Sequence, residues 1–185
     1  IALLKQMEGF ISKPVWDYSQ YSVGYGSRVE KDSEEYKRYM ESGITEKEAD
    51  ALLRTYVAIA EKSINAFNTN NGLGLNQNQF DALIIFSYNC GTGWINGSGE
   101  FRTAVVNHST GNTFLDAIAS WCKAGGAIQR GLIVRRLAEA NIYLNGVYST
   151  AQPAQYCYVL FNAFGGYCGT QVIAYDASSP ITALP

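Results

Sequence analysis

The sequence predicts a mainly helical α+β fold, and three observations support this prediction. Apolar residues recur at helical spacing through most of residues 45–145. Residues 15–29 and 156–175 are instead rich in Val, Tyr and other strand-forming residues, and glycines interrupt them. Hydrophobic residues make up 47% and charged residues 16% of the 185 residues, which is typical of a globular chain with a sizeable core.

Composition and charge exclude some classes of protein. The formal net charge of −2 argues against a nucleic-acid binder, which usually carries a basic face. No apolar run reaches the roughly 18 residues that a membrane span requires. The chain begins at Ile1 without a signal-peptide pattern and stops after residues 181–185 without a turn or cap. We therefore expect a fragment of a longer protein, whose leader was either removed or never included. We also expect it to be a monomer.

The predicted helices have recognisable starts and stops. Residues 2–11 indicate a short helix that ends near Gly9, because glycine favours a helix end. Thr45-Glu-Lys-Glu48 is a capping box that starts a long amphipathic helix reaching Phe67. The stretch from Phe80 to Tyr88 is apolar almost all round, as in a buried central helix. Further helices are predicted at about 100–108, 113–123 and 131–145.

Two segments lie outside this helical pattern. The charged residues 30–43 are expected to form a solvated excursion. Composition changes after Gly146, a plausible helix stop, so we predict a main domain at 1–146 and a linker with a small β segment at 147–185. A lone two-stranded hairpin is marginal in water, so it must pack on the main domain, use a disulfide, or be half of a larger unit.

The four cysteines leave two interpretations open. None has the paired spacing of a zinc site, and the chain has one histidine. The even count is compatible with disulfides in an oxidising compartment, whereas buried free thiols are the alternative. The residues concerned are Cys90, Cys122, Cys157 and Cys168.

Two carboxyl groups near the N-terminus stand in different surroundings. Glu8 ends an apolar helix, where partial burial favours the protonated form of a carboxyl group. Asp17 lies in the polar turn Trp16-Asp-Tyr-Ser-Gln20, where it should stay ionised. Glycosidic-bond cleavage needs such a pair, one carboxyl to donate a proton and one carboxylate to activate water or attack. The pair alone is weak evidence, since most Glu and Asp pairs at this spacing have no catalytic role.

The motif around these residues resembles that of a known family. Glu8-Gly9, Asp17 and Ser22-Val-Gly-Tyr-Gly26 are similar to the catalytic signature of the phage-type lysozymes, glycoside hydrolase family 24. In that family eight residues separate the helix-ending Glu from the Asp, as they do here. Three later blocks resemble the family in the same order, and they are Gly43–Ala49, Asn76–Gly91 and Gly131–Glu139. The resemblance covers about residues 1–146 and implies a lysozyme-like fold with a small N-terminal β-hairpin region and a helical C-terminal lobe.

The resemblance also implies roles for individual residues. Glu8 would be the general acid, Asp17 would orient or activate the water, and the Ser22 hydroxyl would help to hold that water. Substrate-binding roles fall on Tyr25, Arg28, Tyr88 and Asn89. For Tyr88 and Asn89, ordinary helix packing is the alternative interpretation.

This sequence departs from the family pattern at the catalytic turn. Four residues separate Asp17 from Ser22, where the best-known members have five. Ser22 replaces a Thr, which loses a methyl group that restricts the side-chain rotamer. Ser27 stands where many members have His. These departures therefore affect the geometry that would hold the water and leave the acid unchanged.

A pair of arginines has two interpretations. Arg135 and Arg136 could include a residue close to Glu8 that tunes its charge or binds an anionic substrate. The favoured alternative is a structural ion pair, for example with Glu139.

The C-terminal segment carries a second resemblance. The stretches Tyr158–Gly166, Val172–Asp176 and Ile181–Pro185 are similar to the start of the Listeria–Bacteroides type β repeat of bacterial surface proteins. This favours a secreted or cell-surface bacterial protein over a phage endolysin acting on the cell wall.

Together these resemblances imply a muramidase. It would hydrolyse the β-1,4 bond between N-acetylmuramic acid and N-acetylglucosamine in peptidoglycan, with inversion and without a metal or organic cofactor. Two alternatives are a lysozyme-like domain that binds a glycan or protein without cutting, and a hydrolase of chitin-like polymers.

Overall fold

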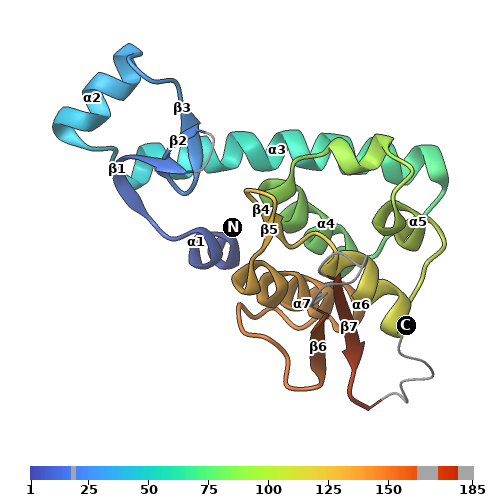
Figure 1. Cartoon of the computed structure of the whole chain (residues 1–185). Helices are drawn as coiled ribbons and strands as arrows, with labels where there is room; N and C mark the ends of the chain where they lie inside the picture. The colour runs from blue at the N-terminus through green and yellow to red at the C-terminus, as the bar shows by residue number, and fades with distance from the viewer. Residues whose placement is uncertain (18–19, 162–170, 179–185) are drawn as a thin grey trace. The chain divides into compact units, whose positions relative to one another are not determined.

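The computed structural model describes residues 1–17, 20–161 and 171–178 (Figure 1). It confirms the predicted class, because long helices dominate and the strands form only small antiparallel sheets. The chain divides into two compact units, Ile1–Glu61 and Lys62–Pro185. The helix α3 (Glu46–Asn71) contributes residues to both units. Each unit is described by itself.

The first unit is built on α1 (Ala2–Glu8) and a three-stranded sheet in the order β1-β2-β3. As predicted, α1 is short, and it ends at Gly9, which has a φ of 68°. The sheet contacts α3 closely, since a β-carbon placed on Gly24 would lie 2.8 Å from Cβ of Ala49. The strands are β1 (Ile11–Asp17), β2 (Gln20–Gly24) and β3 (Ser27–Val29).

The first strand begins earlier than the sequence predicted. We expected strands from residue 15, but β1 starts at Ile11 and includes the buried Pro14. Its pairing with β2 is irregular between Ile11 and Val15. Proline lacks an N–H for the ladder, so it is tolerated in an edge strand at such an irregularity.

Residues 30–43 are mostly exposed, as expected of a solvated segment, but the sequence did not predict that most of them form the helix α2 (Glu34–Ser42). Ser33 caps it, because its Oγ accepts a hydrogen bond from the amide of Tyr36 at 3.1 Å. Glu34 and Glu35 stand in the first turn, where negative charge is favourable. Tyr39 is the one side chain of this helix that is buried, and this explains why composition alone suggested a solvated segment.

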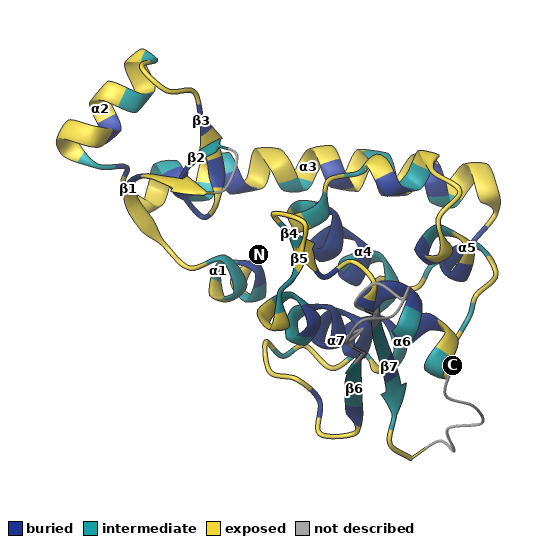
Figure 2. Cartoon of the chain, viewed as in Figure 1, coloured by how far each residue is buried: buried dark blue, intermediate teal, exposed yellow. Residues whose placement is uncertain are grey.

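The long helix α3 begins as predicted. Thr45 Oγ1 accepts a hydrogen bond from the amide of Glu48 at 3.2 Å, and the amide of Thr45 donates to Glu48 Oε2 at 2.9 Å. This reciprocal pair is the capping box. Exposed and buried residues alternate along the helix in Figure 2, and its fully buried side chains are Ala49, Leu53, Ala60, Ile64 and Phe67.

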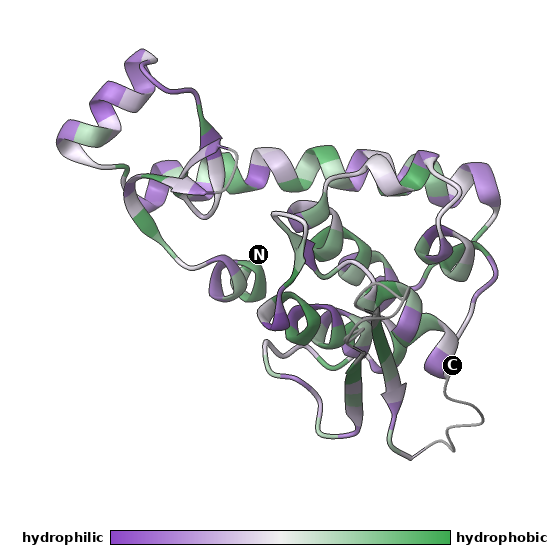
Figure 3. Cartoon of the chain, viewed as in Figure 1, coloured by the Kyte–Doolittle hydropathy of each residue, from purple (hydrophilic) through white to green (hydrophobic). Residues whose placement is uncertain are grey.

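The second unit is a cluster of helices around two buried ones, α4 and α7. Residues 82–87 of α4 are all buried, which confirms the predicted central helix, and α4 packs against α7. Gly146 ends α7 in the left-handed conformation, also as predicted. Figure 3 shows α7 with both apolar and hydrophilic segments, because its buried residues include Arg136 and Glu139. The elements are α4 (Gln77–Cys90), η1 (Gly93–Asn96), α5 (Glu100–Val106), α6 (Gly111–Ala119), β4 (Lys123–Ala124), β5 (Ala127–Ile128) and α7 (Arg130–Asn145).

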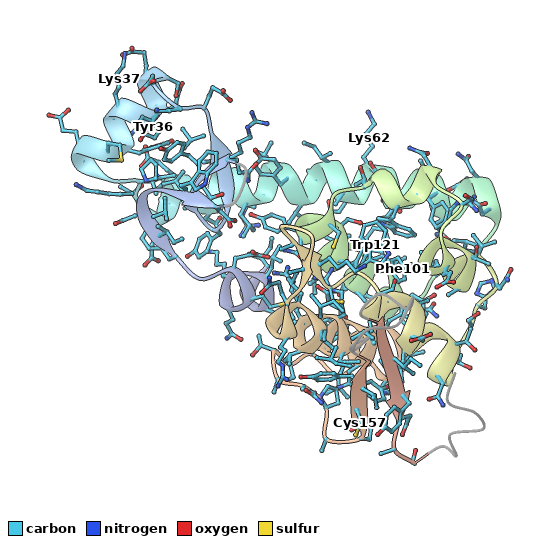
Figure 4. All side chains as sticks on the ribbon, in the orientation of Figure 1. Tyr36, Lys37, Lys62, Phe101, Trp121 and Cys157 are labelled. Carbon is cyan, nitrogen blue, oxygen red and sulfur yellow. The ribbon has the colours of Figure 1, made fainter. Side chains whose placement is uncertain are left out.

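An aromatic cluster fills the core of the second unit. The ring of Phe86 lies 4.3 Å from that of Phe101, 5.4 Å from Trp121 and 6.0 Å from Trp94, measured between centroids. Figure 4 labels Phe101 and Trp121. The indole N–H of Trp94 donates to Ser87 Oγ at 2.9 Å, so its polar atom is satisfied inside the core.

The C-terminal segment forms the predicted antiparallel hairpin, β6 (Tyr156–Phe161) with β7 (Gln171–Asp176). It belongs to the second unit and packs against α6. The predicted glycine turn around residue 164 lies outside the described residues. The predicted domain boundary at residue 146 stays a prediction.

Side chains of α6 close one edge of this hairpin. The amide of Ala174 donates to Asp116 Oδ1 at 3.4 Å, and the amide of Asp176 donates to Asn112 Oδ1 at 2.9 Å. Burial raises the pKa of Asp116 above its ordinary value. A marginal two-stranded sheet is thus anchored to a helix through its own backbone, one of the solutions expected from the sequence.

The thiols are free where they are described. Cys90, Cys122 and Cys157 form no disulfide, and Cys168 lies outside the described residues. Among the helices of the described part, none is long and apolar enough to cross a membrane.

Removal of the α3 cap should weaken the fold. We expect Thr45→Ala to lower the free energy of unfolding by about 1 kcal/mol, because the first turn loses its side-chain acceptor. Urea unfolding followed by circular dichroism measures this change. The matched control is Thr55→Ala in the same helix, whose hydroxyl donates only to the Ala51 carbonyl. It should be neutral or slightly stabilising, and an equal loss in both variants would contradict the capping role.

The stability that Glu48 contributes to the same cap should depend on pH. Hydrogen bonds from the Thr45 amide and from Arg38 lower the pKa of Glu48 from 4.5 to about 2. A lowered folded-state pKa gives stability that is present above pH 4.5 and lost as the pH falls toward 2. The stability difference between wild type and Glu48→Gln, which lacks the titrating carboxyl group, should therefore shrink across this window in urea titrations. A difference that stays constant from pH 6 to pH 2.5 would contradict this account.

Candidate active site

Glu8 is the last residue of α1 and is half-buried. Its carboxylate lies beside the turn between β2 and β3, since a β-carbon placed on Gly26 would be 3.6 Å from Glu8 Oε2. Gly26 has a φ of 85°, so glycine meets both a conformational need and a close approach there. The helix end and the Ser22–Gly26 motif, 14 residues apart at their nearest ends in the sequence, are therefore neighbours in the first unit.

The strand register places the other predicted site residues on one face of the sheet. Asp17 pairs with Gln20, and Ser22 pairs with both Val15 and Arg28. Paired residues of antiparallel strands project from the same side, and residues two apart in a strand share that side. Asp17, Ser22 and Arg28 therefore share one face, as the predicted roles require.

Ser22 is nearly inaccessible, with 4% of its surface exposed. Its Oγ accepts a hydrogen bond from Gln20 Nε2 at 3.3 Å. Sequence reasoning missed Gln20. The spacing of four residues between Asp17 and Ser22 was the available signal, and with this spacing Gln20 pairs with Asp17 in the ladder.

The buried Ser27 differs from Ser22 in two respects. It pairs with Val23 and so projects from the opposite face of the sheet. Its Oγ is buried without a hydrogen-bond partner among the described residues. The departure from His at this position therefore leaves the face that carries Asp17 unchanged.

The remaining predicted residues of the first unit differ in exposure. Tyr25 is buried, with its ring centroid 5.6 Å from that of Phe10 and 5.1 Å from Lys5 Nζ. Lys5 in turn pairs with Asp50 of α3, which raises the pKa of the lysine. Arg28 is exposed and pairs with Glu30 at 3.0 Å. Tyr25 thus contacts α1 through Lys5, whereas the guanidinium group of Arg28 is exposed to solvent.

Tyr88 and Asn89 lie in the last turn of the helix α4, in the second unit. Tyr88 is half-buried and Asn89 is exposed. Asn89 Oδ1 accepts a hydrogen bond from Arg136 at 2.7 Å, so the orientation of its amide is fixed from inside the unit. Packing of α4 does not exclude the predicted contact with substrate, because the exposed part of Asn89 remains available.

Arg136 is fully buried and makes a network of contacts. Its Nε lies 3.0 Å from Glu139 Oε2, and one terminal nitrogen donates to Cys90 Sγ at 2.6 Å. Arg135 Nε also pairs with Glu139 Oε1, at 3.0 Å. The favoured interpretation of these arginines as a structural ion pair is confirmed. Burial raises the pKa of the Cys90 thiol, which keeps it neutral beside this pair.

All three predicted catalytic residues, Glu8, Asp17 and Ser22, lie within the first unit. It offers a half-buried carboxyl group at a helix end and an exposed carboxylate at a strand end, accompanied by a hydroxyl on the same face as that carboxylate. Such a set can donate one proton and orient one water molecule.

Comparison with solved structures identifies the architecture as lysozyme-like. The muramidase domain of SpmX from Asticaccaulis excentricus superposes with a TM-score of 0.62 and 25% identity, covering 78% of this chain and 93% of that domain. The active form of the P1 phage endolysin Lyz superposes with a TM-score of 0.61 at 18% identity, covering 78% of this chain and 82% of that one. The second likeness concerns the fold alone.

Sequence comparison shows the family. The phage lysozyme family model matches residues 5–139, and the chain therefore belongs to the phage lysozyme family. It is 32% identical over 153 residues to the endolysin of Bacillus phage PZA, covering 79% of this chain and 54% of that protein. It is 29% identical over 153 residues to the endolysin of Lactococcus phage c2, covering 80% and 60%. The chain thus spans little more than half the length of the curated relatives it matches.

The buried network around Arg136 should be important for the stability of the second unit. We expect Arg136→Met to lower the free energy of unfolding by about 3–5 kcal/mol, because the buried Glu139 loses one of its two guanidinium partners and keeps only Arg135. Urea unfolding measures the loss. The control Arg130→Met, at the exposed start of the same helix, should change stability by less than about 0.5 kcal/mol. A loss below 1 kcal/mol in Arg136→Met would contradict this role.

Proposed function

We propose that this chain is a muramidase that hydrolyses the β-1,4 bond between N-acetylmuramic acid and N-acetylglucosamine in peptidoglycan. One observation carries the proposal. Within a phage lysozyme match over residues 5–139, the half-buried Glu8 lies beside the Gly26 turn of the sheet that presents Asp17 and Ser22. The printed names of its relatives, endolysin and muramidase domain, agree with this activity.

The proposed mechanism is a single displacement with inversion. Glu8 donates its proton to the glycosidic oxygen as the bond from this oxygen to the anomeric carbon breaks. A water oxygen bonds to the opposite face of that carbon, and Asp17 accepts the proton that the water loses. Exchange with solvent then returns Asp17 to its ionised form and Glu8 to its protonated form. Ser22 orients the water by accepting or donating one hydrogen bond.

Four residues are proposed to bind the glycan. The exposed guanidinium group of Arg28, on the same sheet face as Asp17, suits the lactyl carboxylate of muramic acid. Because Arg136 holds Asn89 Oδ1, the amide nitrogen of Asn89 is the group that would donate to an N-acetyl oxygen. Tyr88 would stack on a sugar ring. Tyr25 is retained as a predicted contact, although its ring is largely buried.

The finer classification also belongs to this proposal. We assign the chain to glycoside hydrolase family 24, acting as a monomer without a metal or organic cofactor. We place its site of action at the bacterial cell wall, as a secreted or cell-surface protein or as a phage endolysin. The similarity of the segment after residue 158 to a Listeria–Bacteroides type repeat stays a proposal, and parts of that segment (162–170 and 179–185) lie outside the described residues.

Replacement of the acid tests the proposal. We expect Glu8→Gln to lower kcat on purified peptidoglycan by at least about 100-fold, because an amide cannot supply the proton. Mass spectrometry of the digest measures the products and shows which sugar carries the new reducing end. Muramic acid at the reducing end supports a muramidase.

Two controls sharpen this test. Glu35→Gln, on the exposed first turn of α2, should retain wild-type activity, and circular dichroism should show that Glu8→Gln is folded. Wild-type activity in Glu8→Gln would reject the catalytic assignment. Co-sedimentation of the wild type with cell walls without new reducing ends would support the non-cutting alternative. Soluble products from chitin but not from peptidoglycan would support the chitinase alternative.

A further inference from the structure

We propose that Gln20 is a positioning residue for the hydrolytic water, acting by holding the Ser22 hydroxyl in one orientation on the face that carries Asp17. This inference rests on the proposed function and extends it to a residue outside the signature motif. Gln20 is polar and half-buried, and it lies between the two groups that would hold the water.

A direct contact links Gln20 to Ser22. Gln20 Nε2 donates to Ser22 Oγ at 3.3 Å, and both residues belong to β2, two positions apart, so they project from the same side. A serine hydroxyl has one donor and two acceptor positions. With one acceptor position taken by Gln20, the hydroxyl proton and the second lone pair are left to other partners. The bond therefore orients these remaining positions.

The hairpin register explains why Gln20 can do this here. Asp17 is the ladder partner of Gln20, so the β-carbons of these two residues are close neighbours, about 5 Å apart in such pairs. The side chains of Asp17, Gln20 and Ser22 therefore lie next to one another on a single face of the sheet. The Gln20 amide is uncharged, so it can stand beside the Asp17 carboxylate without like-charge repulsion.

Ser22 needs such a restraint. An unbranched serine side chain has three staggered χ1 positions and its hydroxyl rotates freely, whereas a β-branched residue at this place would be stiff at χ1. With no restraint, about three χ1 positions and about three hydroxyl orientations share the population, so the competent one falls to roughly a ninth. The hydrogen bond from Gln20 supplies the restraint that a branched side chain would otherwise give.

The first test separates kcat from KM. We expect Gln20→Leu to lower kcat on peptidoglycan by about 5- to 10-fold, because the Ser22 hydroxyl then spreads over several orientations. KM should stay unchanged within about twofold, because Gln20 positions a water-holding group rather than the glycan. The matched control is Gln77→Leu, which removes an amide that donates to Asp81 at the exposed start of α4. It should leave both constants unchanged.

Rescue is the second test. Adding Ser22→Thr to Gln20→Leu should raise kcat again to within about twofold of the wild type, because the branched side chain restores stiffness at χ1. Urea unfolding of each variant shows whether the double variant is folded as stably as the single one. A merely structural Gln20 would change the unfolding midpoint without the selective loss and recovery of kcat.

Nuclear magnetic resonance gives a readout that does not depend on activity. In the wild type, the Hα–Hβ couplings of Ser22 should correspond to a single rotamer. In Gln20→Leu, the couplings should be averaged over several rotamers. In the double variant, the couplings of residue 22 should again correspond to a single rotamer. Averaged couplings in the wild type would overturn the proposal. So would a Gln20→Leu variant with unchanged kcat, or a folded double variant without recovery.

These readouts also separate this inference from the proposed function. If the wild type releases no reducing ends, the muramidase assignment fails and the catalytic role of Gln20 fails with it. In that case a single Ser22 rotamer that Gln20→Leu releases would still support the restraint. If the wild type is active but Gln20→Leu matches it, the muramidase assignment stands and this inference is overturned.

Discussion

The antiparallel register between β1, β2 and β3 is the constraint on which the proposed catalytic geometry depends. Because side chains alternate along a strand, a shift of one residue would turn Asp17, Ser22 and Arg28 to different faces. The sheet is fixed from outside by close packing. Gly24 lies so near Ala49 that a larger residue would not fit, and Glu8 lies against Gly26. The same contacts that set the register therefore also bring the acid to the sheet.

The sequence predicted those parts of the fold that depend on local chemistry. The capping box at Thr45, the helix stops at Gly9 and Gly146 and the apolar central helix α4 are each determined by a few neighbouring residues. The errors concern tertiary context. A charged segment became α2, whose Tyr39 is buried, and β1 accommodates Pro14 because its pairing is irregular there. Neither packing effect is visible in composition.

Some residues of the candidate site could likewise be predicted from local sequence, and others could not. The roles proposed for Glu8, Asp17 and Ser22 rest on a motif whose spacing could be compared with a family. The structural ion pair of Arg136 was predictable from its distance to Glu139 along a helix. Gln20 lies outside the motif, and its contact with Ser22 and its pairing with Asp17 follow from the strand register rather than from the motif.

The helix-anchored edge of the C-terminal hairpin affects how the sheet can be extended. Unpaired strand edges readily accept another strand, but Asp116 and Asn112 already occupy two backbone donors of β7. A strand arriving on that side would first have to displace both side chains. The outer edge of β7 is thereby protected from edge-to-edge pairing with a strand of another molecule.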